Sequence, residues 1–446
     1  MAHPRERRVP PPGVSRREFL RKSAIAAAAT PSLAAILAAC TKPGAAPSGG
    51  GPSGSNGPGT GKFWPSGSPY PLARQDAPVT WNLWQDPIPS GKPVESGATL
   101  QIYNWDSYIN LAVVKKFCEH YNCKYQITTF NNTDEALAKM HSGKLKFDIF
   151  FPTIDILGKL VTAQLLQPLQ HSYVPHLVSD VFETFQNPFY DQQWRYTVPY
   201  TLYTTGIAYR RDVIPDATIA GMSNPWEILA DPTYKGKSGI YDDYRESISM
   251  ALLKNGVTDL NTTSEKDLSA AQAYLTELIS AVNIRADING VFIGIPRGNY
   301  DVHLAWSGDA IGAYNYWPKL TYGYYQKIGY WFPSNRVGAI NNDLITIPTS
   351  APHPVLAHAF LDWMMTYEMA MLNFSWNGYQ PPQKQADVNT LTTTNNAYGV
   401  PYVFPWMKEA VVNDADFKTG LLELELTPET DQLWHNVWQA FQAGVK

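Results

Sequence analysis

Short apolar segments alternate with amphipathic segments through most of this chain, and that alternation constrains the fold more than any other feature. The sequence predicts strands over residues 100–103, 124–130 and 147–151, separated by helices over 111–121 and 136–141. Later candidates are a strand over 207–210, helices over 247–255 and 264–278, strands over 302–306 and 343–347, and a long helix over 355–373. Strands that alternate with helices are typical of an α/β protein. The 446 residues are enough for two or three domains with hydrophobic cores.

The N-terminus has the features of an export signal. Arg16 and Arg17 form a twin-arginine pair, and an apolar stretch over residues 24–37 follows them. This stretch is too short for a permanent membrane helix but suits a signal peptide. It ends in Leu37-Ala38-Ala39-Cys40, which resembles the lipobox of bacterial lipoproteins. We therefore expect a twin-arginine signal peptide over residues 1–39 and a lipid on Cys40; the alternative is an ordinary cleavage site with an incidental cysteine.

The segment after Cys40 is expected to be a tether. Residues 41–62 are almost entirely Gly, Pro, Ala and Ser, a composition that cannot bury apolar surface. Residues 40–62 are therefore predicted to be the lipidated cysteine and a flexible tether, and residues 63–97 an extended arm over the first domain. No other stretch approaches 18 consecutive apolar residues. These features predict an exported protein, in the periplasm or at the outer face of the cytoplasmic membrane, anchored by lipid.

Charge and composition exclude some functions. Seven of the 35 basic and two of the 39 acidic residues precede Cys40, which leaves 28 basic against 37 acidic residues, a balance of −9. A nucleic-acid binder would be basic, so none is expected as a partner. An acidic surface favours cationic ligands. The 14 Trp and 26 Tyr suggest a binding surface lined with rings.

Two further cysteines lie close together in the sequence. Outside the cytoplasm, Cys118 and Cys123 are predicted to form a disulfide, with two free thiols as the alternative. They are a poor zinc site because no second pair of ligands accompanies them. The sequence Lys235-Gly236-Lys237-Ser238 lacks the glycine of a phosphate-binding loop, since position 231 is aspartate. No motif nominates a catalytic residue, and no cofactor or metal is expected.

Six short motifs occur in the order found in the bacterial periplasmic spermidine/putrescine-binding protein family, which the chain resembles over most of residues 98–382. They are Tyr103-Asn104-Trp105-Asp106-Ser107-Tyr108, the strand 147–151 with Pro152-Thr153, Val198-Pro199-Tyr200 with Thr205-Gly206-Ile207, Asp242-Asp243-Tyr244-Arg245-Glu246, Trp306-Ser307-Gly308-Asp309, and Gly378-Tyr379-Gln380-Pro381. The resemblance implies a two-lobed α/β periplasmic-binding-protein fold of type II that closes like a hinge. Lobe 1 would comprise residues 98–204 and 307–355, and lobe 2 residues 205–306 and 356–446.

The resemblance also implies a polyamine site in the cleft at the ends of strands. A polyamine needs separated carboxylates to pair its ammonium groups and aromatic faces to contact its methylenes. Trp105, Tyr108 and Trp306 would be the rings. The carboxylates would be Asp243, Glu246 and Asp309, and the other expected lining residues are Asp106, Thr153, Asp155, Asn341 and Gln380.

Several of these residues also have a purely structural interpretation. Asp243 and Glu246 could serve simply to cap a helix, Asp309 simply to form a turn, and Thr153 simply as a helix N-cap. The chain also departs from the family pattern. Its acid is Asp106 where the family has one at the next position, and Asp155 and Asn341 stand where the family has aromatic residues. The pocket should therefore be more polar than is usual in the family.

The resemblance implies the substrate-binding component of an ABC importer for a polyamine of the putrescine/spermidine class, not an enzyme. Its partners would be the permease, the cytoplasmic ATPase and, through its lipid, the membrane; the protein is expected to be a monomer. One alternative is the same role for another small cationic or amino compound. A second is an exported enzyme of the cell envelope.

Overall fold

The computed structural model describes residues 68, 70–143, 146–177, 181–317, 325–396 and 399–445. The chain divides into a unit of residues 1–52 and a unit of residues 53–446, and all described residues belong to the second. The twin-arginine pair, Cys40 and the tether lie outside the described residues. None of the helices in the described part of the chain is long and apolar enough to cross a membrane.

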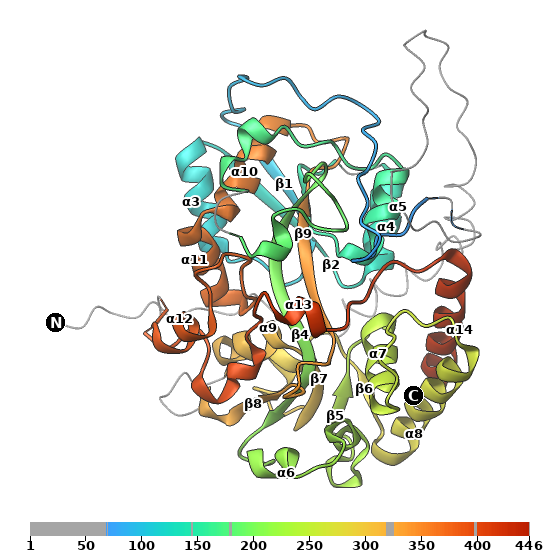
Figure 1. The fold of residues 1–446 in the computed structure, drawn as a ribbon. Coiled ribbons are helices and arrows are strands. Elements are labelled where there is room, and N and C mark those ends of the chain that lie inside the picture. The colour runs from blue at the N-terminus through green and yellow to red at the C-terminus, as the bar shows by residue number, and fades with distance from the viewer. Residues whose placement is uncertain are drawn as a thin grey trace, which may run out of the picture. The chain divides into compact units, whose positions relative to one another are not determined.

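The first lobe is built on a five-stranded sheet of order β2-β1-β3-β9-β4 (Figure 1). Three parallel strands, β1 (Thr99–Trp105), β2 (Lys124–Phe130) and β3 (Ile149–Phe150), form one side of it. Strand β9 (Ile340–Thr346) runs antiparallel to β3 and to the first half of β4 (Thr197–Arg210). Parallel strands need long crossovers between them, which is why helices separate them in the sequence.

The second lobe repeats this order. Its strands are β5 (Ser238–Ile240), β6 (Arg285–Ala286), β7 (Val302–Trp306) and β8 (Ile328–Trp331), arranged as β6-β5-β7-β4-β8 with the second half of β4. Strand β4 is antiparallel to β7 and β8, as β9 is to its neighbours in the first lobe. In each lobe, the antiparallel strand next to the parallel ones follows a crossing of the chain from the other lobe. This strand is β9 in the first lobe and the second half of β4 in the second.

Helices flank both sheets (Figure 1). Those of the first lobe are α3 (Leu111–Tyr121), α4 (Thr133–Ser142), α5 (Leu157–Thr162) and α10 (Pro354–Met365), and α11 (Tyr367–Asn377) joins the two lobes. The second lobe carries α6 (Asp216–Ala220), α7 (Tyr244–Lys254), α8 (Glu265–Val282), α9 (Ser307–Gly312), α12 (Val388–Thr393) and α14 (Pro428–Gly444), and the short α13 (Asp416–Thr419) packs on the first. Polar N-caps such as Asn132 and Ser264 accept backbone N–H groups of the first turn, which explains where these helices begin.

Two separate hydrophobic cores define the lobes. The first core includes β4 as far as Tyr203, and the second begins at Ile207. The sequence expectation placed residues 307–355 in lobe 1 and 356–446 in lobe 2. In the structure, α9 and β8 pack in the second core and α10 packs in the first, so the chain returns between β8 and β9. The expected division differs because a helix of either lobe has the same apolar pattern.

Several predicted elements differ in extent from those in the structure. The expected helix over 355–373 is two helices, because Thr366 has extended backbone dihedral angles (φ −67°, ψ 135°). The expected strand over 147–151 is paired only at Ile149–Phe150. Helix α7 begins at Tyr244 instead of at 247, which places Asp243 at its N-cap and Glu246 in its first turn.

The arm before the first strand packs against the first lobe. Tyr70, Leu72, Val79 and Trp81 are buried in the first core, and the Trp81 indole N–H donates to the carbonyl of Tyr190 (2.8 Å). Because large apolar side chains are buried along it, the arm stabilises the lobe it covers.

The cysteine pair lies at the end of α3. Asn122 has a left-handed conformation there, and the turn brings the two sulfur atoms to 3.0 Å. Cys118 and Cys123 are nevertheless free thiols in the structure, and the expected disulfide is not formed in it. Because the turn already places the sulfurs side by side, the bridge remains a prediction for the protein in an oxidising compartment.

Candidate ligand-binding site

A pocket lies between the two lobes, with walls from both. Its atom-free space, counted together with the open solvent at its mouth, is about 1060 Å³. From the first lobe, the pocket is lined by the ends of β1 and β2 and by the turn Ile154–Ile156 that precedes α5. From the second lobe, it is lined by the start of α7 and the end of β7. The lining carboxylates are Asp106, Asp155, Asp243, Glu246, Asp309, Asp343 and Glu423.

The pocket is strongly anionic. Seven carboxylates and one guanidinium, that of Arg245, line it, with no lysine or histidine among the lining residues. The guanidinium is already engaged: it donates to the carbonyls of Leu424 (2.9 Å) and Leu260 (3.0 Å) and lies 4.7 Å from the Trp434 ring centre. The charge balance therefore favours a ligand with more than one positive charge.

Asp309 is a buried carboxylate held by two tyrosines. The hydroxyls of Tyr241 and Tyr379 each donate to it at 2.8 Å. Burial raises the pKa of Asp309 to about 7, although the two hydroxyl donors favour the charged form. The preceding Gly308 is required for this arrangement, because a Cβ there would lie 2.3 Å from the Tyr379 ring.

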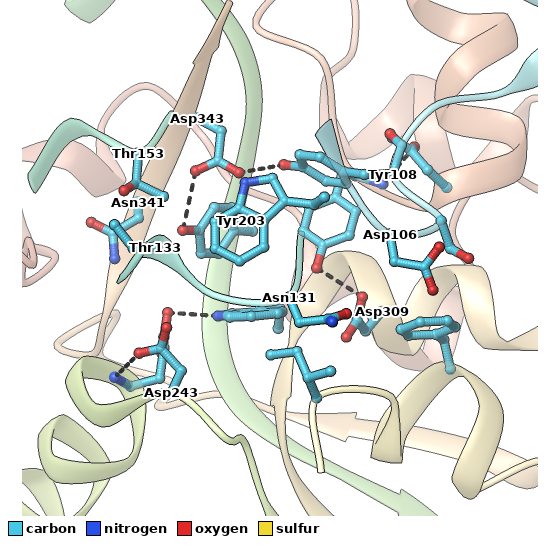
Figure 2. Close-up of a pocket in the computed structure, with 18 of the residues that line it drawn as sticks. Asp106, Tyr108, Asn131, Thr133, Thr153, Tyr203, Asp243, Asp309, Asn341 and Asp343 are labelled. Atoms are coloured by element: carbon cyan, nitrogen blue, oxygen red, sulfur yellow. Dashed lines mark hydrogen bonds between the residues drawn. The ribbon is translucent and has the colours of Figure 1, made fainter. Parts of the chain in front are cut away.

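Asp343 on β9 has a similar environment. The Tyr108 hydroxyl donates to it at 2.6 Å and the Tyr203 hydroxyl at 3.4 Å (Figure 2). Burial raises the pKa of Asp343 to about 7. Tyr108 also packs edge-on against Tyr379, with ring centres 4.7 Å apart, so the two tyrosine–carboxylate pairs share one aromatic cluster.

A third group of carboxylates lies at the N-terminus of α7. The Asp243 carboxylate accepts the backbone N–H of Glu246 at 3.1 Å as an N-cap. The Trp306 indole N–H donates to Glu246 Oε1 at 2.5 Å. Burial raises the pKa of Asp243 to about 6 and raises that of Glu246 well above its usual value. Figure 2 shows Asp243, Asp309 and Asp343 reaching the pocket from different sides.

Aromatic rings lie between these carboxylate groups. Trp306 stacks on Tyr241 with ring centres 4.0 Å apart, and Trp105 packs against Phe130 at 4.6 Å. Tyr203 lies edge-on to Trp306, with ring centres 6.2 Å apart. Such faces contact methylene groups and attract cations. Among the described residues, no group of three or more His, Cys, Asp or Glu side chains is placed to hold a metal ion.

Comparison with known proteins places this pocket in a family. The model of the bacterial extracellular solute-binding proteins matches residues 112–398. The chain belongs to this family.

Relatives of known function belong to the polyamine branch of solute-binding proteins. The chain is 26% identical to the putrescine/agmatine-binding protein of Pseudomonas aeruginosa over 364 residues, which cover 78% of this chain and 92% of the relative. It is 23% identical to the spermidine/putrescine-binding periplasmic protein of Escherichia coli over 308 residues, which cover 67% of this chain and 81% of that protein.

Solved structures of solute-binding proteins share the fold. The PotD lipoprotein of Treponema pallidum superposes with a TM-score of 0.61 at 21% identity, covering 77% of this chain and 99% of that one. The substrate-binding protein PotD of Streptococcus pneumoniae gives a TM-score of 0.59 at 20% identity, covering 78% of this chain and all of the other. The expected two-lobed periplasmic-binding-protein fold is thus confirmed.

The structure brings most of the expected site residues of this solute-binding protein together. Ten of the eleven line the pocket: Trp105, Asp106, Tyr108, Thr153, Asp155, Asp243, Glu246, Trp306, Asp309 and Asn341. Gln380 does not. Its amide donates to the carbonyls of Ala386 (2.9 Å) and Val412 (2.8 Å) and accepts the Val412 N–H, so it holds the chain together behind the site. Its neighbour Tyr379 faces the pocket instead, as alternation along an extended segment requires.

The sequence prediction missed several lining side chains, among them Tyr203, Asp343 and Glu423. Tyr203 and Asp343 lie on β4 and β9, whose residues at the crossing are all buried, so no apolar–polar alternation distinguishes the pocket side. Glu423 lies on an extended segment far along the chain from every motif used. A glutamate flanked by leucines, Leu422 and Leu424, is the one signal that could have indicated it.

Proposed function

We propose that this protein is the extracellular substrate-binding component of an ABC importer and that its ligand is a polyamine. The observation that carries this proposal is the alternation of carboxylates and rings in a pocket between two lobes. Carboxylates at the Asp309, Asp343 and Asp243 positions provide separated anionic sites, and Trp306, Trp105 and Tyr203 provide faces between them. A chain of ammonium groups joined by methylenes matches that pattern.

The names of the relatives support the same ligand class. Both the Pseudomonas and the Escherichia proteins are named for putrescine together with a second amine. The lobe interface also supports a hinge that closes on its ligand, since β4 passes directly from one core to the other. Delivery to a permease, with an ATPase behind it, follows from that role.

Another small cationic or amino compound is the alternative ligand. Asp155 and Asn341, where the family has rings, make the pocket more polar and favour it. A thermal-shift panel of putrescine, agmatine, spermidine, spermine, amino acids and sugars distinguishes these classes. A polyamine at 100 times its dissociation constant should add roughly 2.7 kcal/mol to stability. Stabilisation by an amino acid or a sugar, with none by any polyamine, would overturn the polyamine proposal.

The anchor is a separate proposal. Cys40 follows the lipobox-like residues Leu37-Ala38-Ala39, and the tether after it would let the lobes reach along the membrane. We expect the wild-type protein in the membrane fraction and the Cys40→Ala variant in the soluble fraction. A variant that stays with the membrane would remove the lipid anchor from this account.

A further inference from the structure

The extended segment between α13 and α14 carries two buried glutamates. Leu422 and Leu424 are buried in the first core and Leu426 in the second, so this segment also crosses between the lobes. Between the leucines, Glu423 and Glu425 are only 6% and 5% exposed. Residues two apart in an extended chain face the same side, yet the two carboxylates have different environments.

Glu425 is fully used inside the protein. Its carboxylate accepts the Tyr70 hydroxyl at 2.6 Å and the backbone N–H groups of Gly158 (3.0 Å) and Lys159 (3.1 Å). The arm holds the backbone as well, since Arg74 donates to the Glu425 carbonyl at 2.8 Å. These bonds fix the segment independently of any ligand.

Glu423, in contrast, lines the pocket with an unsatisfied oxygen. Its backbone is fixed, because its N–H donates to Asn341 Oδ1 at 3.2 Å and the next N–H to Asn261 Oδ1 at 2.7 Å. Its Oε1 is buried without a hydrogen-bond partner, and the same is true of Glu246 Oε2 in the same pocket. The Ser249 hydroxyl already favours a charge on the Glu423 carboxylate. A buried acceptor left unpaired costs stability, so the two unpaired oxygens would gain from a further donor brought by a ligand.

The charged groups around Glu423 do not donate a hydrogen bond to its Oε1. Asp155 and Asp243 lie close enough to repel a charge on Glu423. Arg245 attracts that charge, but its terminal N–H groups donate to backbone carbonyls and Asn261, and its Nε has no hydrogen-bond partner. Burial, together with these acids, raises the pKa of Glu423 to about 7. An added cation would relieve this repulsion.

We infer that Glu423 is a ligand-binding carboxylate, which with Glu246 receives a second cationic group of the ligand, away from the group paired with Asp309. This rests on the proposed function. It means that the extended C-terminal segment, held by the N-terminal arm, contributes to specificity for ligands charged at both ends. A ligand whose second end is neutral would leave both unsatisfied carboxylate oxygens without a charged partner.

The test compares putrescine with 4-amino-1-butanol, which replaces one ammonium by a hydroxyl. Calorimetric titration gives the ratio of their dissociation constants for the wild type, Glu423→Gln and Glu425→Gln. The wild type should prefer putrescine, and Glu423→Gln should reduce that preference by about tenfold or more. Glu425→Gln is the matched control, two residues away and equally buried, and should keep the wild-type ratio.

The outcomes separate the two proposals. If the wild type binds putrescine and the Glu423→Gln ratio is unchanged, the inference fails and the proposed function stands. If the wild type binds no polyamine, both fail. Thermal unfolding of both variants without ligand reports folding, and a Glu423→Gln protein that does not fold would assign Glu423 a structural role and overturn the inference. An equal fall in the ratio for Glu425→Gln would overturn it as well.

Discussion

Asp309 shows how a single carboxylate can be held ready for a cation. Two tyrosine hydroxyls donate to it, and the remaining lone pairs are left for a ligand in the pocket. Burial keeps its pKa near 7, so its negative charge costs free energy until a cation arrives. The buried charge of Asp309 therefore destabilises the free protein, and the same burial strengthens its interaction with a bound cation.

We predict that Asp309→Asn lowers affinity for a bound polyamine by a hundredfold or more. The change removes the partner of a buried ammonium, which costs on the order of 3–5 kcal/mol. The free protein should be no less stable, because the amide keeps an acceptor oxygen and avoids a buried charge. Calorimetric titration and thermal unfolding without ligand measure the two effects. Unchanged affinity would make Asp309 only a turn former.

The sequence predicted pocket-lining residues well where a recognisable motif lies in a polar loop. It predicted them poorly where they lie on a strand that is buried on both faces. Trp105, Tyr108 and Asp309 come from such motifs and line the pocket. Asp343 lies within a strand whose seven residues are all buried, and so its position next to two tyrosines depends on how β9 pairs with β4. That pairing is a long-range contact that no local pattern encodes.

Helix α7 shows how one element can serve both the fold and the site. Asp243 caps its N-terminus while the residue also lines the pocket, so the observed cap does not conflict with the proposed ligand role. The proposed ligand role can be separated from the cap because serine caps a helix as well as aspartate does.

We predict that Asp243→Ser weakens polyamine binding while leaving thermal stability nearly unchanged. Asp243→Ala should weaken binding to a similar degree and also cost about 0.5–2 kcal/mol of stability through the lost cap. Denaturant unfolding and calorimetric titration of both variants check this. If Asp243→Ser bound as the wild type does, the aspartate would be a cap alone.

Element boundaries were predicted best where caps are explicit in the sequence. Helix α3 has the predicted bounds, and the Asn110 side chain caps its first turn. The division of the 355–373 segment at Thr366 was not predictable, since the apolar residues continue across it and neither Gly nor Pro marks the break. The break at Thr366 instead depends on tertiary packing, because α10 packs in the first core and α11 contacts both cores.

At the scale of the whole protein, ion pairs join the lobes near the pocket. Lys159 of α5, in the first lobe, lies 3.0 Å from Asp431 of α14, in the second. Asp431 also accepts the hydroxyl of Tyr244, a pocket residue, at 2.7 Å. Although burial alone would raise it, the Lys159 ammonium, His435 and Tyr244 hold the pKa of Asp431 well below its usual range. This pair therefore stabilises the arrangement of the lobes seen in the structure.

We predict that Lys159→Met weakens ligand binding and speeds ligand release. Without the Lys159 ammonium, Asp431 keeps His435 and Tyr244 as partners, and the contact between the lobes weakens. The population of the lobe arrangement that binds ligand would fall, and apparent affinity falls with that population. Stopped-flow displacement gives the release rate. Lys139→Met is the control, because Lys139 pairs with Glu135 within α4 alone. Tighter binding by Lys159→Met would contradict this prediction. It would mean that the Lys159 ammonium weakens binding by repelling a cationic ligand more than it strengthens binding by joining the lobes.

The raised pKa values of Asp309, Asp343 and Glu423, each about 7, make the free protein sensitive to pH. In the unfolded chain these groups have pKa values near 4, so between about pH 4 and 7 the folded protein holds more protons than the unfolded one. The stability that these groups contribute therefore decreases as pH rises through that range. A bound polyamine, which stays cationic there, reverses the trend by favouring the ionised carboxylates.

We therefore predict that polyamine binding at pH 6 releases protons and that affinity rises from pH 5.5 to 8. Each carboxyl that is neutral in the free protein must lose its proton before it pairs with an ammonium group. Calorimetric titrations at pH 6 in buffers of different ionisation enthalpy count the protons. Asp309→Asn should release fewer than the wild type, since one titrating group is gone. Heats that do not depend on the buffer would show that the carboxyls are already ionised, and that the pocket holds its charge without the ligand's help.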